Sequence, residues 1–103
     1  MIPESALGLL GLAARARSLA VGTAAVREGL QRGVVRVVVL AADRSARTAD
    51  KVERLARGKG VPVVLGPPAA ALGARIGRAA VQAVGVTDRS VAEGLLAKLS
   101  SRQ

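Results

Sequence analysis

Residues 22–40 read GTAAVREGLQRGVVRVVVL, and this stretch decides the fold that we expect for the whole chain. Its first half predicts a helix, because Gly22 gives a flexible entry and Gly33 stands where a helix commonly ends. From residue 34 to residue 40 the pattern changes to an almost unbroken apolar run, which is typical of a strand covered on both faces. The sequence therefore predicts one helix that leads directly into a central buried strand.

The start of this helix is a candidate anion-binding site. The first backbone N–H groups of a helix have no partner within it and carry the positive end of its dipole. Gly22 lets a phosphate group approach the backbone closely, and Thr23 adds a hydroxyl group, so we consider the pair a contact point for nucleic acid. The alternative is an ordinary helix start, because one glycine–threonine pair is weak support for a binding site.

The amino-acid composition excludes several classes of function. The 103 residues include no His, Cys, Phe, Tyr or Trp, and 50% are hydrophobic, which suits a single domain over residues 1–103. Without His and Cys there is no imidazole or thiolate metal site, no disulfide frame and no Ser–His–Asp or Cys–His nucleophilic system. Without aromatic residues there is no stacking platform for single-stranded nucleic acid. We therefore expect no catalytic residues, no metal and no cofactor.

The net charge points to a polyanionic partner. The formal charge is +9 and the isoelectric point is about 11.8, which favours RNA, DNA or an anionic membrane surface. We favour nucleic acid and a cytoplasmic protein, because no apolar run approaches the roughly 20 residues of a membrane span and the start lacks a basic leader. The alternative is a GC-rich coding bias, which accounts for 13 Arg against 3 Lys better than for 16 basic against 7 acidic residues.

Helical and strand patterns alternate along the chain. This alternation predicts an α/β fold, a three-layer α/β/α sandwich with a four-stranded, mainly parallel or mixed sheet. The polar tail, residues 100–103, is expected to fray. The expected helices cover residues 5–17, 22–33, 45–57, 67–77 and 90–99, and the expected strands cover residues 19–21, 34–40, 61–65 and 79–87.

The loop after the central strand, residues 41–45, is a second candidate contact. In open α/β sheets ligands gather outside the carboxyl ends of the strands, so Arg44 and Arg47 are candidate phosphate contacts. The exposed side of the next helix also carries cations, but the i,i+4 pair of Asp50 with Arg54 indicates an ordinary solvated surface.

Two short motifs have structural interpretations. Gly73 and Gly77 have the GxxxG spacing, which in a soluble domain indicates tight packing rather than a membrane dimer. Ser90 and Glu93 have the spacing of a capping box at the start of the last helix.

Several segments, taken in this order and spacing, match one known family across nearly the full length of the chain. They are LLGLAARAR (9–17), VGTAAVREGLQRG (21–33), VRVVVLAADRS (35–45), VPVV (61–64), LGARIGRAAVQAVGVTD (72–88) and the closing helix. On these segments the chain resembles the kink-turn RNA-binding ribosomal protein family of L-seven-Ae, L-thirty-e and Gadd-type proteins, and most closely its bacterial YlxQ-like branch.

The resemblance implies a three-layer fold and binding to kinked RNA. The implied contacts are the start of the second helix, the loop after the following strand and the loop before the last strand. Gly22 and Thr23 match the family's glycine-led helix start. With the neighbouring cations, the candidate RNA-binding residues are Arg17, Gly22, Thr23, Arg27, Asp43, Arg44, Arg75 and Arg78.

The chain departs from the family pattern just after Thr23. Ala24 and Ala25 stand where RNA-binding members typically carry Asn and Glu, and Glu28 stands where they carry a basic residue. Arg27 is one position earlier and points about 100° away around the helix. Because alanine cannot read base edges, we expect broad contact with structured RNA rather than faithful kink-turn recognition.

Three functions follow, in order of support. The first is a non-enzymatic, monomeric RNA-binding protein that associates with the ribosome or ribosomal proteins, its arginines gathered at one end of the sheet. The second is a protein–protein interaction module that has lost kink-turn recognition, which Ala24, Ala25 and Glu28 favour. The third, an enzyme or nucleotide binder, is weak, because the chain has no P-loop and no Gly-x-Gly-x-x-Gly after a strand.

Overall fold

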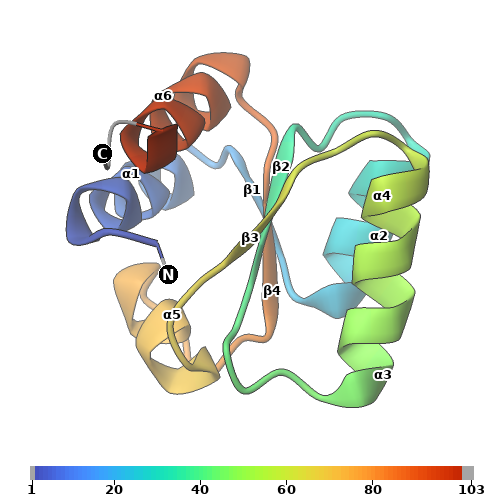
Figure 1. Cartoon of the computed structure of the whole chain (residues 1–103). Coiled ribbons are helices and arrows are strands. Elements are labelled where there is room, and N and C mark those ends of the chain that lie inside the picture. The colour runs from blue at the N-terminus through green and yellow to red at the C-terminus, as the bar shows by residue number, and fades with distance from the viewer. Residues whose placement is uncertain (1, 101–103) are drawn as a thin grey trace.

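The computed structural model describes residues 2–100, and their helices and strands alternate in the predicted order (Figure 1). The tail residues 101–103, for which we expect fraying, lie outside the described residues. No helix in the described part is long and apolar enough to cross a membrane. The elements are α1 (Glu4–Arg15), β1 (Leu19–Val21), α2 (Thr23–Gln31), β2 (Val37–Leu40), α3 (Ala46–Thr48), the π-helical turn η1 (Ala49–Glu53), α4 (Arg54–Gly58), β3 (Val63–Leu65), α5 (Ala69–Arg75), β4 (Ala83–Val86) and α6 (Arg89–Ser100).

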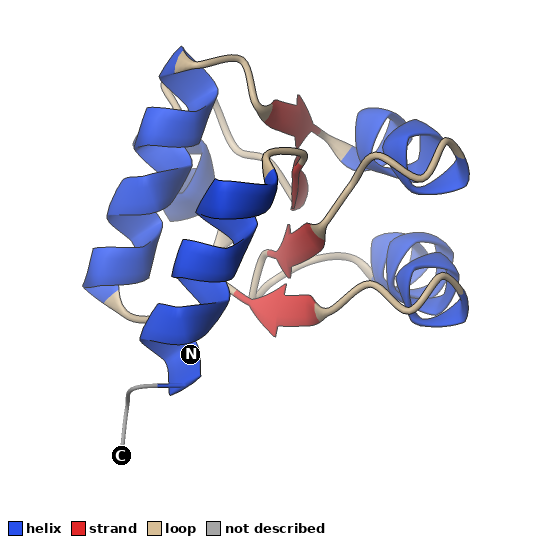
Figure 2. Ribbon diagram, turned by 90° about the horizontal axis from the view of Figure 1, so that it is seen from above, coloured by secondary structure: helices blue, strands red, loops and turns tan. Residues whose placement is uncertain are grey.

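The sheet has the strand order β1-β4-β2-β3. β4 pairs antiparallel with both β1 and β2, while β2 and β3 are parallel, so the sheet is mixed. Helices α1, α5 and α6 cover one face, and α2 covers the other together with the continuous segment α3, η1 and α4 (Figure 2). The predicted three-layer α/β/α sandwich is confirmed, and β2 is a central strand.

Each face of the sheet has its own apolar core. Val37 and Val39 pack under α1, α5 and α6, in a cluster with Leu10. Val38 and Leu40 point to the opposite face and pack against α2 and α4. All four residues of β2 are buried, because side chains alternate between two covered faces. This double coverage explains the apolar run in the sequence.

The two longest predicted strands are shorter in the structure. The central strand begins at Val37 rather than residue 34, because the N–H group of Val34 donates to the carbonyl oxygen of Gly29 and closes the end of α2. The last strand covers only Ala83–Val86. The apolar composition therefore predicted that these strands exist, but not the residues at which they begin and end.

The last helix has a different cap from the predicted one. The Asp88 carboxylate accepts a hydrogen bond from the N–H group of Val91 at 3.0 Å, and α6 begins at Arg89. The prediction of a capping box at Ser90 is wrong, because Asp88 reaches the first turn two residues earlier.

Four helices end in the same left-handed conformation. Gly33, Gly60 and Gly77 follow α2, α4 and α5 with φ angles of 75°, 71° and 73°. Glycine is the usual residue at this position because it has no Cβ. At the end of α1 the equivalent residue is Arg17, with φ of 59°, the one described non-glycine residue with a positive φ.

Candidate nucleic-acid interface

Four connections meet at one end of the sheet, at the bottom of Figure 1. Val21 pairs with Val84, and Leu40 pairs with both Ala83 and Leu65, so β1, β2 and β3 end where β4 begins. Helices α2, α3 and α5 start at this end. We call it the rim, and define it as residues 22–25, 41–48, 66–69 and 78–82.

Backbone hydrogen bonds hold the rim together. The N–H group of Gly22 donates to the carbonyl of Ala83 at 2.9 Å, and that of Ala41 donates to the carbonyl of Gln82 at 2.9 Å. The side-chain oxygen of Gln82 accepts a further bond from the N–H group of Ser45 at 2.8 Å. Segments far apart in sequence are therefore fixed beside one another, as the sequence predicts for these loops.

The first turn of α2 lies open at the rim. Gly22 has φ of 93° and ψ of 159°, a conformation almost restricted to glycine. The first hydrogen bond within the helix runs from the N–H group of Val26 to Gly22, so those of Thr23, Ala24 and Ala25 have no partner within it. Ala24 is exposed. The leading turn is thus available to an anion.

Hydroxyl groups from two helix starts meet beside this turn. The hydroxyl oxygens of Thr23 and Thr48 are 3.5 Å apart. Ser45 caps α3, because its hydroxyl accepts from the Thr48 N–H group at 3.1 Å and donates to the Thr48 hydroxyl at 3.1 Å. Sequence reasoning placed Ser45 in the candidate loop 41–45 but missed Thr48 and Gln82 as rim residues. The capping role of Ser45 could have been predicted, because serine is a typical N-cap residue before a helix.

Two predicted contact residues shape the rim loop instead of projecting from it. The Asp43 carboxylate accepts from the N–H group of Ala69 at 2.7 Å and caps α5. The Arg44 guanidinium donates to the carbonyl of Ala41 at 3.4 Å and lies 3.7 Å from the Glu53 carboxylate. The Arg44 side chain therefore folds inward beside η1.

The structure does not gather the predicted arginines into one surface, which corrects that expectation. Arg27 lines a groove of about 480 Å³ between α2 and α4, along with Lys51 and Lys59. Arg75 pairs with Glu4 of α1 on the other side of the sheet. Long flexible side chains take the nearest acidic partner or groove, and helical periodicity does not encode that choice.

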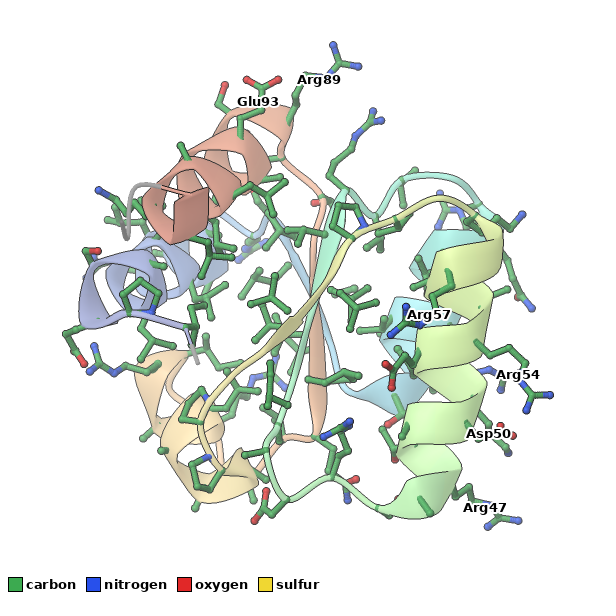
Figure 3. All side chains as sticks on the ribbon, viewed as in Figure 1. Arg47, Asp50, Arg54, Arg57, Arg89 and Glu93 are labelled. Carbon is green, nitrogen blue, oxygen red and sulfur yellow. The ribbon has the colours of Figure 1, made fainter. Side chains whose placement is uncertain are left out.

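Arg17 and Arg78 do come together, in a cleft beside β1 that meets the rim only at Arg78. They line a cleft of about 350 Å³ next to Leu19 and Val21 of β1. Arg78 belongs to the rim loop 78–82, so it connects the two regions, while Arg17 lies outside the rim. Arg47, a further candidate, is exposed at the rim end of α3 (Figure 3).

The outer side of the long helix carries ion pairs. Arg54 pairs with Asp50 at 2.7 Å, with both side chains largely exposed. Arg57 donates to the Glu53 carboxylate at 2.6 Å, and this bond, assisted by the charge of Arg44, lowers the pKa of Glu53 below its ordinary value of 4.5. The pairs at i,i+4 agree with a solvated face. Among residues 2–100, no three acidic side chains are grouped so as to hold a metal ion.

Comparison with known proteins gives a family and two related folds. The sequence model of the ribosomal protein L7Ae/L30e/S12e/Gadd45 family matches residues 4–95, whereas the search of curated proteins found no match. A protein of unknown function from Bacillus halodurans has a TM-score of 0.89 and 32% identity, covering 96% of this chain and 100% of its own. The Giardia lamblia 15.5kD RNA binding protein has a TM-score of 0.74 and 21% identity, covering 92% and 84%, a likeness of fold alone.

Proposed function

The chain belongs to the ribosomal protein L7Ae/L30e/S12e/Gadd45 family, and from this membership we propose that it is a non-enzymatic RNA-binding protein. The proposed contact surface is the rim. It binds structured, kink-turn-like RNA with broad rather than base-specific contacts. The Giardia lamblia protein of the same fold is named as RNA binding, which supports the same class of partner.

One observation carries the proposal: the first turn of α2 is open and pinned beside two other rim segments. The N–H groups of Thr23, Ala24 and Ala25 have no partner within α2, and Ala24 is exposed; they lie at the positive end of the helix dipole, where a phosphate group is stabilised. The Thr23 hydroxyl belongs to the same turn and lies 3.5 Å from that of the buried Thr48, and the exposed Arg47 adds charge. Such groups position a phosphate backbone but do not read base edges.

The test is binding of a fluorescent kink-turn RNA, compared with the same duplex lacking the kink, across a series of salt concentrations. Each lost phosphate contact lowers the slope of log affinity against log salt by about one. Arg47→Glu and Arg78→Glu are each expected to weaken binding with the fold intact. Arg89→Glu is the matched control, because Arg89 lies at the opposite end of the molecule (Figure 3).

Two outcomes would count against the rim. Affinity that does not change with salt would remove the phosphate contacts on which the proposal depends. An equal loss for Arg89→Glu and Arg47→Glu would mean that total charge, rather than the rim, governs binding. Arg27→Glu is also informative, because weaker RNA binding by this variant would mean that the RNA-binding surface extends into the groove between α2 and α4.

Ribosome association is part of the same proposal, with the protein acting as a cytoplasmic monomer. The family is named for ribosomal proteins, and a charge of +9 suits ribosomal RNA. The tagged protein is expected to sediment with ribosomal particles, and the Arg47→Glu variant is expected not to. Sedimentation that survives nuclease treatment would favour a protein partner.

A protein–protein interaction module is the second candidate function. Ala24 and Glu28 are both exposed on α2, so this helix presents a methyl group and a negative charge where the family resemblance implies a base-reading side chain and a basic one. Glu28→Lys distinguishes the two functions. It is expected to strengthen RNA binding if RNA occupies this face and to leave RNA binding unchanged if a protein does.

A further inference from the structure

We propose that the free edge of β1 binds an extended acidic peptide segment of a partner protein. The segment would add a strand beside β1, with its carboxylates between Arg17 and Arg78. This site lies in the cleft beside β1, which shares Arg78 with the rim but does not include the start of α2 that is proposed to contact RNA. It is therefore a second binding activity.

The backbone of β1 presents unused hydrogen-bonding groups at its outer edge. β1 is the terminal strand of the sheet. Ser18 and Gly22 both hydrogen-bond to the β4 side through their main chains, and in an antiparallel ladder such contacts recur at every second residue. The N–H and C=O groups of Ala20 therefore also point toward β4, and those of Leu19 and Val21 point outward. Within residues 2–100, none of the backbone hydrogen bonds outside the helices and the sheet ladders uses these four groups.

The opposite edge of the sheet is treated differently. At β3, the carbonyl oxygen of Leu65 accepts a hydrogen bond from the N–H group of Ile2 at 3.2 Å, so the chain itself occupies part of that edge. Leu19 and Val21 remain half-exposed and line the cleft. An exposed strand edge of this kind is a template for pairing with another strand.

The charge of the cleft selects the chemistry of the added strand. Arg17 and Arg78 line it, with Ala14 and Ile76 as apolar walls, and no acidic residue is among its lining residues. Arg17 also occupies the left-handed helix-end position that is glycine after α2, α4 and α5. The cleft is thus lined by an arginine at a position where glycine is conformationally easier.

These features favour an acidic peptide over the other occupants. A second copy of this chain would bring further arginines against Arg17 and Arg78, with a net charge of +9 on each copy. The phosphate groups of RNA are acceptors only, and they would leave the carbonyl groups of Leu19 and Val21 without donors. A peptide backbone supplies donors and acceptors in alternation, and its Glu or Asp side chains supply the negative charge.

The experiment uses the whole protein and a fluorescein-labelled peptide of alternating valine and glutamate. We expect saturable binding by fluorescence anisotropy and chemical-shift changes at the amides of Leu19 and Val21. A control peptide with proline in place of each valine keeps the charge but lacks the backbone N–H groups of the valine residues, so it is expected not to bind. Arg17→Gly is expected to weaken binding by about tenfold, while Arg32→Ala, on the far side of the sheet, leaves binding unchanged.

Val21→Pro tests the backbone pairing, because it removes an outward N–H group and no bond to β4. It is expected to abolish peptide binding, and Arg17→Gly, which suits the local φ angle, provides a folded variant if Val21→Pro is unstable. The proposal is overturned by equal binding of the proline peptide, or by binding that survives both variants. It is also overturned if the peptide leaves the chemical shifts of the Leu19 and Val21 amides unchanged while kink-turn RNA, or dimerisation of the protein alone, changes them.

Discussion

Gly73→Ala is predicted to destabilise the protein by displacing the rim loop. A Cβ atom at Gly73 would lie 1.7 Å from the carbonyl oxygen of Ala79, a contact that must open to at least 3.0 Å. The shift also disturbs the bond from the N–H group of Arg78 to the carbonyl of Gly73, now 2.8 Å. Overpacking destabilises the fold by about 1–3 kcal/mol, and loss of the hydrogen bond destabilises it by about 1 kcal/mol. The higher helix propensity of alanine stabilises it by about 1 kcal/mol. The free energy of unfolding is therefore expected to fall by about 2 kcal/mol.

The assay is urea unfolding followed by circular dichroism, with RNA affinity measured on the folded variant. Because the displaced loop carries Arg78 and Gln82, we expect RNA affinity to fall by about tenfold, or about 1.4 kcal/mol. Gly8→Ala is the matched control. It also replaces a helical glycine, but its Cβ atom would meet no atom within 4 Å, so it is expected to be neutral or to stabilise by up to about 1 kcal/mol.

Equal stability of the Gly73→Ala and Gly8→Ala variants would refute this reasoning. That result would mean that α5 and the loop separate without cost, and that the close approach at Gly73 does not hold the rim in place. A stability loss with unchanged RNA affinity would keep the packing argument but remove loop 78–82 from the proposed RNA surface.

Three further predictions test local features. Arg17→Gly is expected to raise the free energy of unfolding by about 1 kcal/mol, because glycine adopts the left-handed conformation with less strain. Thermal unfolding measures this change, and a less stable variant would contradict the prediction. Ser45→Ala is expected to cost about 1 kcal/mol in urea unfolding, because the N–H group of Thr48 loses its cap, and no change would exclude that role. Arg57 holds the pKa of Glu53 below 4.5, so the stability from this group is present above pH 4.5 and is lost as pH falls through the lowered pKa. Acid titration of the wild type and of Glu53→Gln should show a smaller acid-induced loss in the variant, and identical profiles would contradict the assignment.

The sequence predicted the elements of the fold well, because their signals are local. The apolar run through β2 requires cover on both faces, and the structure has a core on each side of Val38 and Val39. The spacing of Gly73 and Gly77 predicted tight packing, and the structure confirms it at Gly73. Gly77 has another role, as the left-handed residue that ends α5.

The candidate site was predicted less completely. The family resemblance implied that the start of α2, the loop after β2 and the loop before β4 share one surface, and backbone hydrogen bonds hold them together. It did not include residues 66–69, which also lie at the rim. Arg44, however, pairs with Glu53, and Arg75 pairs with Glu4, partners that belong to other elements. Gln82 holds Ser45 at the rim, although the two residues are far apart in sequence and no motif connects them.

The sequence by itself determined the order of helices and strands, the double burial of β2 and the positive charge. Each of these is a property of neighbouring residues or of composition. The tertiary structure alone decided that β4 lies between β1 and β2, that β1 keeps a free edge, and that Arg17 and Arg78 share a cleft. These features depend on contacts between distant segments, and periodicity along the chain does not encode which distant groups meet.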